Sequence, residues 1–599
     1  MLENIKKIIC ERHGNDEKQL EVIFSTYPRI LVVAPAGYGK TRTMISKIAY
    51  MIATNQVAYP KRILALTFSV NAAYKIKKDV EKELPEILEG TKIDFDNKLF
   101  ISNYHGFCRS ILKKYGYLIC KDLKKLDDLV TIDDDDPQQT CEAIKGLNVD
   151  IAMNISKFSE AVKKINTEYI KENFNLYNNL VIKEFLTRKF ISFNAVLTLT
   201  IKLLKDYPSI LSFYQNYFAA ILVDEYQDTN ILSFQLLKLM VNNNSKIVLF
   251  GDRLQRIYGF IGAIPHLLDK SKKLFDLEEI RLTKNYRFKN NEKMLLLDAN
   301  LRKNAENPEK PVITKCVKID FKYLRTQEYE AKYVLSKVKE IVQKDRDAKI
   351  AILVRNRGSN VNKIIDVFIS GNIPFFYGLF TDDDKLYRDF NKKCLEYFNF
   401  YVEKLGENIP LKQLLKNVKE KVEKEYSGYK NNYLIKALLK LLEVFSNKII
   451  LEYNNLRYND KVKLIRETFE YRGIRQYMEF VDANVIISTV HASKGLEWDY
   501  VILPDMEKSI FPSWKGLCNK CIFNEFEHCE IKWDEINKSK MSKNFRRDFY
   551  EELSIFYVAV TRAKKGVFFS ASKFRIDRNH NIRKGEISCF LRLPGIVIG

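Results

Sequence analysis

The sequence has little of what marks disordered, secreted or membrane-bound chains. Of its 599 residues only 14 are proline and 22 are glycine, whereas 46% are hydrophobic, a composition typical of a globular protein. No apolar run approaches the ~20 residues that cross a bilayer, and the N-terminus lacks the apolar core of a signal peptide. No internal repeat or low-complexity tract stands out. We therefore expect a cytoplasmic protein without a membrane partner.

The chain is too long for one hydrophobic core, so several domains are expected. Lys and Arg outnumber Asp and Glu by 99 to 76, which gives a net charge of +23. Such a basic protein favours a polyanion partner, because binding to nucleic acid releases counterions. A lysine-rich composition explains the same charge without any partner, so charge alone does not decide between the two interpretations.

Short β-branched runs recur in two groups, one before about residue 285 and one after about residue 345. Near-continuous apolar strands of this kind are typical of parallel sheets covered by helices on both faces. The stretches between them show charged, helical patterns. We predict two α/β domains, each interrupted by a mainly helical insertion. The predicted ranges are 1–112 plus 206–283 for the first α/β domain, 113–205 for its insertion, 284–379 plus 476–599 for the second, and 380–475 for its insertion.

A phosphate-binding loop follows the first strand run, in the stretch APAGYGKT. A small-residue loop that opens a helix with Gly-Lys-Thr points backbone N–H groups at phosphates. We expect Lys40 to reach the β- and γ-phosphate oxygens and the Thr41 hydroxyl to hold Mg²⁺. The strict pattern has glycine where this chain has Ala34. The residues predicted to bind the nucleotide here are Ala34, Pro35, Ala36, Gly37, Tyr38, Gly39, Lys40, Thr41 and Arg42.

An acidic pair ends another buried run, in the stretch AAILVDEYQDT. We expect Asp224 to bind Mg²⁺ through its water shell and Glu225 to orient or deprotonate the attacking water. Two acidic residues at the end of a strand do not by themselves indicate a function. Downstream of a phosphate loop, it predicts nucleotide hydrolysis.

With these two motifs the chain resembles the DExQD-type helicases of superfamily 1, the UvrD/Rep/PcrA family. Further family motifs are matched in the same order by NDEKQLEVI, ILALTFSVNAAYKIKKDV, ISNYHGFCRSIL, LFGDRLQRIYGFIGA, RLTKNYRF, ISTVHASKGLEWDYVILP and EELSIFYVAVTRAKKGVFFS. The resemblance extends from Gln19 to about Pro594 and fails mainly in the two insertions. It implies two RecA-like motor domains, 1A and 2A, with insertions 1B and 2B. It also implies an ATP-dependent DNA helicase that moves along single-stranded DNA, 3′→5′ in this family, and separates duplex at junctions.

The resemblance further implies roles for residues outside the phosphate loop. In this family ATP lies between the motor domains, and Gln255 senses the γ-phosphate. Arg287 and Arg562 resemble the two arginine fingers, whose planar guanidinium groups suit the charge on the transferring phosphoryl group. The residues implied to contact adenine or ribose are Gln19, Tyr286 and Glu497. Those implied to contact the strand are Phe68, Asn71, Tyr104, His105, Tyr258, Phe260, His491 and Lys494, although a core role is the alternative for each aromatic residue.

The motif around Gln255 departs from the family pattern. Leu254 stands where Asp is usual, Phe260 where Trp is usual, and Ile261 where Arg is usual. Phe260 keeps a stacking face, but Ile261 loses a charged contact, so we expect altered coupling between DNA and ATP. The insertions look shorter than in large family members, and we expect no nuclease domain after the second motor domain.

Two other hypotheses stay open at this point. One keeps the ATPase as a subunit that acts with a separate nuclease, in anti-phage defence as in Gabija or in recombination. The other is a nucleic-acid-binding scaffold with weak or no ATPase. The intact residues of the nucleotide site argue against the scaffold.

Three of the ten cysteines cluster in the stretch CNKCIFNEFEHC. Cys518, Cys521, His528 and Cys529 form a candidate four-ligand zinc site, because clustered cysteines in an intracellular chain more often bind metal than form disulfides. A loop with free thiols is the alternative. An iron–sulfur cluster wants a fourth thiolate, and the sequence places none nearby.

Overall fold

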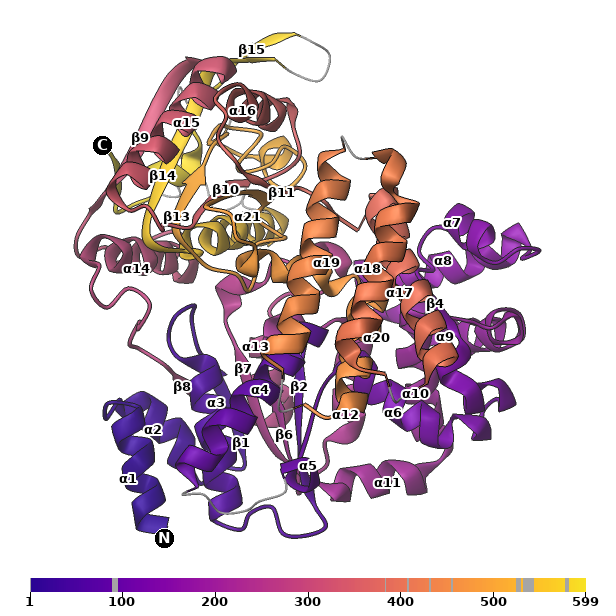
Figure 1. Ribbon diagram of the computed structural model, residues 1–599. Coiled ribbons are helices and arrows are strands. Elements are labelled where there is room, and N and C mark those ends of the chain that lie inside the picture. Colours follow the sequence, from indigo (N-terminus) through magenta and orange to yellow (C-terminus); the bar gives the residue numbers. More distant parts are fainter. Residues whose placement is uncertain are drawn as a thin grey trace. The chain divides into compact units, whose positions relative to one another are not determined.

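The structure of the chain is a computed structural model (Figure 1). It describes residues 2–88, 95–382, 384–406, 409–429, 432–453, 456–523, 529–531, 543–576 and 581–599. The chain divides into two compact units, Met1–Lys284 and Asn285–Gly599.

The first unit is built on a six-stranded parallel sheet. Its strands lie in the order β3-β2-β6-β7-β1-β8. Because every neighbouring pair is parallel, the carboxyl ends of all six strands lie along one edge, where ligands bind in open α/β sheets. The loops that follow β6, β7 and β1 are therefore neighbours. The strand bounds are β1 (Arg29–Val33), β2 (Arg62–Thr67), β3 (Leu99–Asn103), β6 (Phe218–Val223), β7 (Lys246–Gly251) and β8 (Glu278–Arg281).

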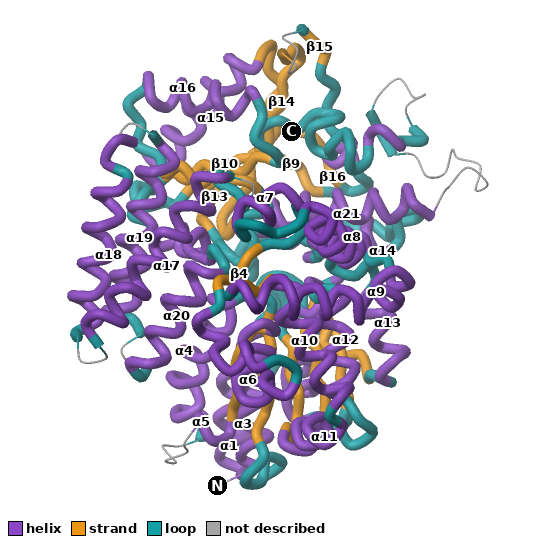
Figure 2. The backbone as a smooth tube through the Cα atoms, turned by 90° about the vertical axis from the view of Figure 1, so that its right-hand side faces the viewer, coloured by secondary structure: helices purple, strands orange, loops and turns teal. Residues whose placement is uncertain are grey.

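The side chains of β1 alternate between two hydrophobic layers, as the two-residue repeat of a strand requires. Ile30 and Val32 pack in the layer that holds side chains of helices α1, α3 and α4. Leu31 and Val33 pack in the opposite layer, with helices α6, α10 and α12. Helices thus cover both faces of the sheet (Figure 2). The helix bounds are α1 (Leu2–Arg12), α3 (Lys40–Ala53), α4 (Val70–Ile87), α6 (Tyr104–Tyr115), α10 (Phe193–Asp206) and α12 (Ile231–Met240).

The helical insertion of the first unit shares the core of the sheet. Phe158 of α8 (Val149–Lys164) and Tyr177 of α9 (Thr167–Leu180) stack with ring centroids 4.1 Å apart. Both belong to the hydrophobic cluster that contains Leu31 and Leu64 of the sheet. A small parallel pair, β4 (Val130–Ile132) and β5 (Phe190–Ser192), completes the insertion. Insertion and sheet are therefore packed around one continuous core.

The second unit is built on an eight-stranded sheet in the order β11-β12-β10-β13-β14-β9-β16, with β15 antiparallel to β14. The remaining pairs are parallel. Helices α15 and α16 pack with β10 and β12 in one hydrophobic cluster. The bounds are β9 (Val317–Thr326), α15 (Gln327–Lys344), β10 (Ile350–Val354), α16 (Ser359–Ser370), β11 (Phe376–Gly378), β12 (Val485–Thr489), β13 (Trp498–Leu503), β14 (Ala563–Ile576), β15 (Ile582–Lys584) and β16 (Ile596–Ile598).

Four long helices lie between β11 and β12 in the chain. They pack side by side, with α17 against α18 and α20, and α18 against α19 (Figure 1). Their bounds are α17 (Lys385–Leu405), α18 (Leu411–Glu425), α19 (Tyr433–Leu451) and α20 (Tyr458–Glu470).

The predicted fold class is confirmed, since each unit is an α/β sheet domain interrupted by a mainly helical insertion. The residue boundaries proposed for the motor domains and insertions stay a prediction. Within the described ranges, no helix combines the length and the apolar character needed to cross a membrane.

Candidate active site

The phosphate loop of the first unit joins β1 to α3. Helix α3 begins at Lys40, directly after Gly39, whose φ of 80° is a left-handed conformation that glycine adopts readily. A side chain at Gly39 would also displace the amide group of Gln19, because its Cβ would lie 2.5 Å from Gln19 Nε2. The first-turn N–H groups of α3 have no partner within the helix, which makes this terminus a suitable phosphate site.

Lys40 is paired with the two acids that follow β6. Its Nζ atom lies 3.4 Å from Asp224 Oδ1 and contacts Glu225 Oε1. Burial lowers the pKa of Lys40, but the charges of Asp224 and then Glu225 outweigh it, so the pKa is raised above its ordinary value. Burial also raises the pKa of Asp224, against the lowering effect of Lys40. The Lys40 ammonium group therefore stays charged. It lies beside the carboxyl groups of Asp224, expected to bind the metal, and Glu225, expected to orient the water.

Glu225 is held in a constrained position. Its φ of 50° is a left-handed conformation, which is uncommon for residues other than glycine and is concentrated at functional sites. Its backbone N–H donates to Asp224 Oδ1 at 2.9 Å, and its Oε2 accepts a hydrogen bond from Gln227 Nε2 at 2.5 Å. Backbone and side chain are thus both fixed, as a residue that orients a water requires.

A chain of hydrogen bonds connects Glu225 to Gln255. Gln227, which donates to Glu225, accepts at its Oε1 from the backbone N–H of Asp252 at 3.1 Å. Asp252 Oδ2 then accepts from Gln255 Nε2 at 2.8 Å. The adjacency of β6 and β7 brings these groups together. Leu254 is only 3% exposed, so an apolar residue suits a position where the family pattern has Asp.

Gln19 lies buried against the phosphate loop. Its Nε2 donates to the Tyr38 carbonyl at 3.0 Å, and its Oε1 accepts from Nδ1 of His13. The other ring nitrogen of His13 lies 2.8 Å from Ser46 Oγ on α3, so a neutral ring accepts there. The role of His13 was not predicted from the sequence. The only indication in the sequence is that His13 lies six residues before Gln19. The amide expected to read adenine thus also fixes the loop.

Three motifs of the second unit converge around Arg287. Its guanidinium group donates to the Thr561 carbonyl at 2.6 Å and pairs with Glu497. Arg562, which follows Thr561 in the chain, is 3% exposed and donates to two backbone carbonyls, each at 3.1 Å. Tyr286 is half-buried beside Arg287 in the chain. The second unit therefore gathers both predicted arginine fingers and the predicted ribose contact in one place.

Aromatic rings predicted to contact the strand form a cluster on the first unit. Phe68 follows β2 and stacks on Tyr258, which follows β7, with centroids 5.0 Å apart and planes 18° apart. The ring centroids of Phe260 and Tyr258 lie 6.2 Å apart, and Phe260 is 63% exposed. An exposed, flat aromatic group at the carboxyl ends of the strands offers a stacking surface for bases.

The other predicted strand contacts differ in exposure. Asn71, His105, His491 and Lys494 are half-buried, and the His105 ring packs edge-on against Phe193 at 5.9 Å. Tyr104 is 5% exposed and belongs to the hydrophobic cluster beneath the sheet. This burial favours the core role given as the alternative for the aromatic residues, and a contact of Tyr104 with the strand stays a prediction.

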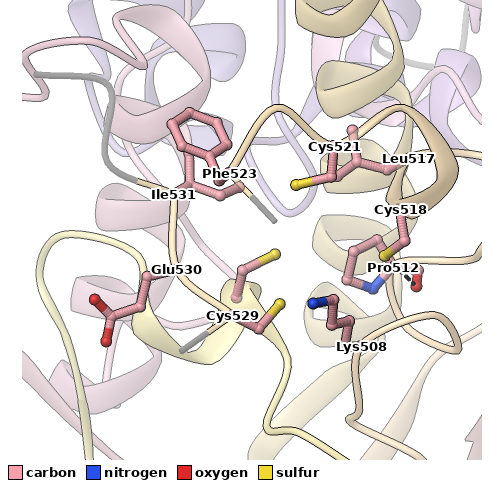
Figure 3. Close-up of a pocket in the computed structure, with 10 residues that line it drawn as sticks. Lys508, Pro512, Leu517, Cys518, Cys521, Phe523, Cys529, Glu530 and Ile531 are labelled. Carbon is pink, nitrogen blue, oxygen red and sulfur yellow. Dashed lines mark hydrogen bonds between the residues drawn. The ribbon is translucent and has the colours of Figure 1, made fainter. Parts of the chain in front are cut away.

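Three of the four predicted zinc ligands line one pocket of the second unit. Cys518, Cys521 and Cys529 point into it (Figure 3). His528 lies outside the described residues. Cys589 lines the same pocket. The expectation that no fourth thiolate lies nearby is therefore wrong, because folding brings in a cysteine distant in sequence.

Parallel sheets with a phosphate loop and an acid pair along the same edge, at the carboxyl ends of β1 and β6, define a P-loop motor protein. A family model described as the UvrD/REP helicase N-terminal domain matches residues 15–276, and one described as the UvrD-like helicase C-terminal domain matches residues 384–574. The chain therefore belongs to the UvrD/Rep/PcrA-like helicases of superfamily 1.

Named relatives are similar over most of their length. A protein of Mycoplasma capricolum named a probable DNA helicase II homolog is 26% identical, over 93% of this chain and 84% of its own. A protein of Staphylococcus aureus named ATP-dependent DNA helicase PcrA is 24% identical, over 94% of this chain and 84% of its own. The PcrA protein of Staphylococcus epidermidis is 25% identical over the same shares.

His13 predicts a pH dependence of stability. Burial lowers its pKa to about 4 from an ordinary value of 6.5. Between these values the unfolded chain binds more protons than the folded chain, so the contribution of His13 is complete above about pH 6.5 and is lost as the pH falls toward about 4. We expect the difference in unfolding free energy between the native protein and His13→Gln to shrink by about 2 kcal/mol from about pH 7.5 to about pH 5. Urea unfolding of the first unit measures this difference, and an unchanged value would contradict the assignment.

Proposed function

We propose that the protein is an ATP-dependent DNA helicase that hydrolyses ATP to move along single-stranded DNA and separate duplex. The observation that carries the proposal is the placement of Lys40 beside Asp224 and Glu225, at the carboxyl ends of β1 and β6, which lie along the same edge of the sheet with β7 between them. Phosphate binding, metal binding and water activation need these three groups together. Membership in the superfamily 1 helicases gives the motor its substrate class.

In this proposal the phosphate loop, residues 34–42, binds the phosphates of ATP. Lys40 exchanges its carboxylate partners for the β- and γ-phosphate oxygens. The Thr41 hydroxyl and, through the water shell, Asp224 would hold Mg²⁺, which would neutralise charge on the phosphates. Glu225 is then released from Lys40 while Gln227 still fixes its Oε2, and it orients and deprotonates the attacking water.

We propose that Arg287 and Arg562 supply positive charge to the γ-phosphate as it leaves. Both guanidinium groups are already oriented by carbonyl oxygens, which reduces the cost of ordering them during the reaction. Tyr286 stacks on adenine, Glu497 contacts the ribose, and Gln19 contacts the adenine edge. Because Gln19 bonds to the Tyr38 carbonyl, base recognition and loop conformation are connected.

Strand binding in this proposal uses the cluster of Phe68, Tyr258 and Phe260. Asn71, His105, His491 and Lys494 add polar and charged contacts. The hydrogen-bond chain from Glu225 ends at Gln255, three residues before Tyr258, so a change at the γ-phosphate is transmitted toward the stacking surface. A 3′→5′ direction and loading at junctions of single and double strands complete the proposal and rest on the family resemblance. A separate nuclease partner stays a prediction from the sequence.

Substituting Lys40 by Ala tests the nucleotide site. We expect the native protein to hydrolyse ATP faster when single-stranded DNA is added. Lys40→Ala should lower this turnover by about 10²-fold or more, because the γ-phosphate loses its positive partner. Phosphate release measures the rate, and Lys7→Ala on α1, whose side chain is 72% exposed, is the matched control. A native protein without turnover in the presence of DNA would instead support the scaffold hypothesis.

Substituting Phe260 by Ala tests the stacking surface. Loss of one stacked base costs ~1–3 kcal/mol, so we expect roughly 5- to 150-fold weaker binding to single-stranded DNA. Fluorescence anisotropy of a labelled oligonucleotide measures the affinity. Tyr27→Ala is the control, because Tyr27 is similarly exposed, at 58%, and precedes β1 at the opposite edge of the sheet. Equal affinities for the two variants would remove Phe260 from the binding surface.

A further inference from the structure

Four cysteines from two distant parts of the chain line one pocket of the second unit. Cys518 begins the turn η10 (Cys518–Lys520), and Cys589 begins η13 (Cys589–Arg592). Cys521 and Cys529 complete the set. The labelled sulfur atoms are directed toward a common space (Figure 3). Free cysteines usually lie scattered through a protein, where they pack like small hydrophobic residues. Such packing does not explain why four of the ten cysteines line one pocket.

The two segments that carry the thiols are fixed to each other. An isolated β-bridge pairs Glu507 with Ile587, two residues before Cys589. Glu530, the residue after Cys529, also lines the pocket, and its carboxylate lies 3.2 Å from the guanidinium group of Arg592. Two separate contacts, the β-bridge and the ion pair, therefore hold the segments that carry the thiols close to one another, so their proximity does not depend on the position of one loop.

The surroundings of the sulfur atoms suit thiolate ligands. Cys518 and Cys589 are 3% and 4% exposed. The backbone N–H of Ser509 donates to Cys518 Sγ at 3.3 Å, and Lys508 also lines the pocket. Such N–H···S bonds and a nearby cation stabilise negative charge on sulfur. Apolar side chains complete most of the lining and limit contact with water: Pro512, Leu517, Phe523 and Ile531.

The spacing of the thiols distinguishes a single ion from a cluster. Four thiolates around one zinc ion, with Zn–S bonds of about 2.3 Å, lie only ~3.8 Å from one another. Among the residues that the structure describes, three or more possible metal-binding atoms lie within 4.8 Å of one another only at Glu330, Asp505 and Glu507. The four thiols are therefore more widely spaced than zinc requires, which suits a cofactor with several metal atoms.

We propose that Cys518, Cys521, Cys529 and Cys589 hold a thiolate-bound metal centre, and that this centre is an iron–sulfur cluster. Four cysteine thiolates are the common ligand set of such clusters. This assignment replaces the zinc site predicted from the sequence, since Cys589 takes the place expected for His528.

The position of the centre indicates what it supports. Lys520, at the end of η10, lies 2.7 Å from Asp548 of α21 (Lys543–Thr561), and Phe523 packs edge-on against Phe545 of the same helix. The opposite end of α21 leads directly to Arg562. A helix of 19 residues extends about 28 Å, so the centre braces α21 without touching the predicted arginine fingers.

Elemental analysis of protein purified without oxygen tests the proposal directly. We expect iron and acid-labile sulfide in equal amounts, with visible charge-transfer absorbance. Cys521→Ser and Cys589→Ser should each lose both, whereas Cys316→Ser, at an exposed cysteine of the same unit, should retain them. Because the native protein is measured first, failure of a variant to fold does not remove the test.

Each other outcome has a defined meaning. One zinc per chain that the Cys→Ser variants lose would keep a four-thiolate centre and overturn the cluster. Native protein without bound metal, or with a disulfide between Cys529 and Cys589 in its mass spectrum, would overturn the proposal. Hydrogen exchange adds an independent measurement, because chelation of the metal should increase exchange in residues 506–523 and 586–592, and unchanged exchange would contradict the bracing of this region.

Discussion

The ion pair between Lys40 and the carboxylates of Asp224 and Glu225 is the interaction on which the rest of the site depends. It forms because β1 and β6 end at the same edge of a parallel sheet, with β7 between them. A buried ammonium group needs a negative partner, and two carboxylates in the same place need a cation. The pair fixes the charges that phosphate and metal require, and it ties the phosphate loop to the acids before any reaction begins.

From this pair, polar contacts extend in two directions through the first unit. One direction runs through Gln227 and Asp252 to Gln255, close to the exposed aromatic surface. The other runs through the phosphate loop to Gln19 and the buried His13 ring. In the proposed helicase, these contacts connect the state of the nucleotide with the base at one end and the DNA strand at the other.

The fold class and the nucleotide loop could be predicted from the sequence because they are local: apolar runs form strands, and Gly-Lys-Thr opens a helix. Cys589 could not be placed with Cys518, since only tertiary pairing brings those segments together. Tyr104 stands in a motif that the family resemblance assigns to strand binding, yet it packs in the hydrophobic cluster that the insertion shares with the sheet. The hydrogen-bond partners of His13, Gln19 and Ser46, come close to its ring only when the chain is folded. What escaped prediction depends on contacts between residues distant in the chain.

Unwinding of tailed duplexes distinguishes an ATP-driven motor on single-stranded DNA from a protein that only binds the strand. Duplexes with a 3′ tail, a 5′ tail or blunt ends are incubated with the native protein and either ATP or a non-hydrolysable analogue. We expect strand separation of the 3′-tailed duplex with ATP and none with the analogue. Separation that proceeds equally with the analogue, or no separation of any tailed duplex despite strand-stimulated ATP hydrolysis, would contradict this expectation; separation from the 5′ tail alone would reverse the proposed direction.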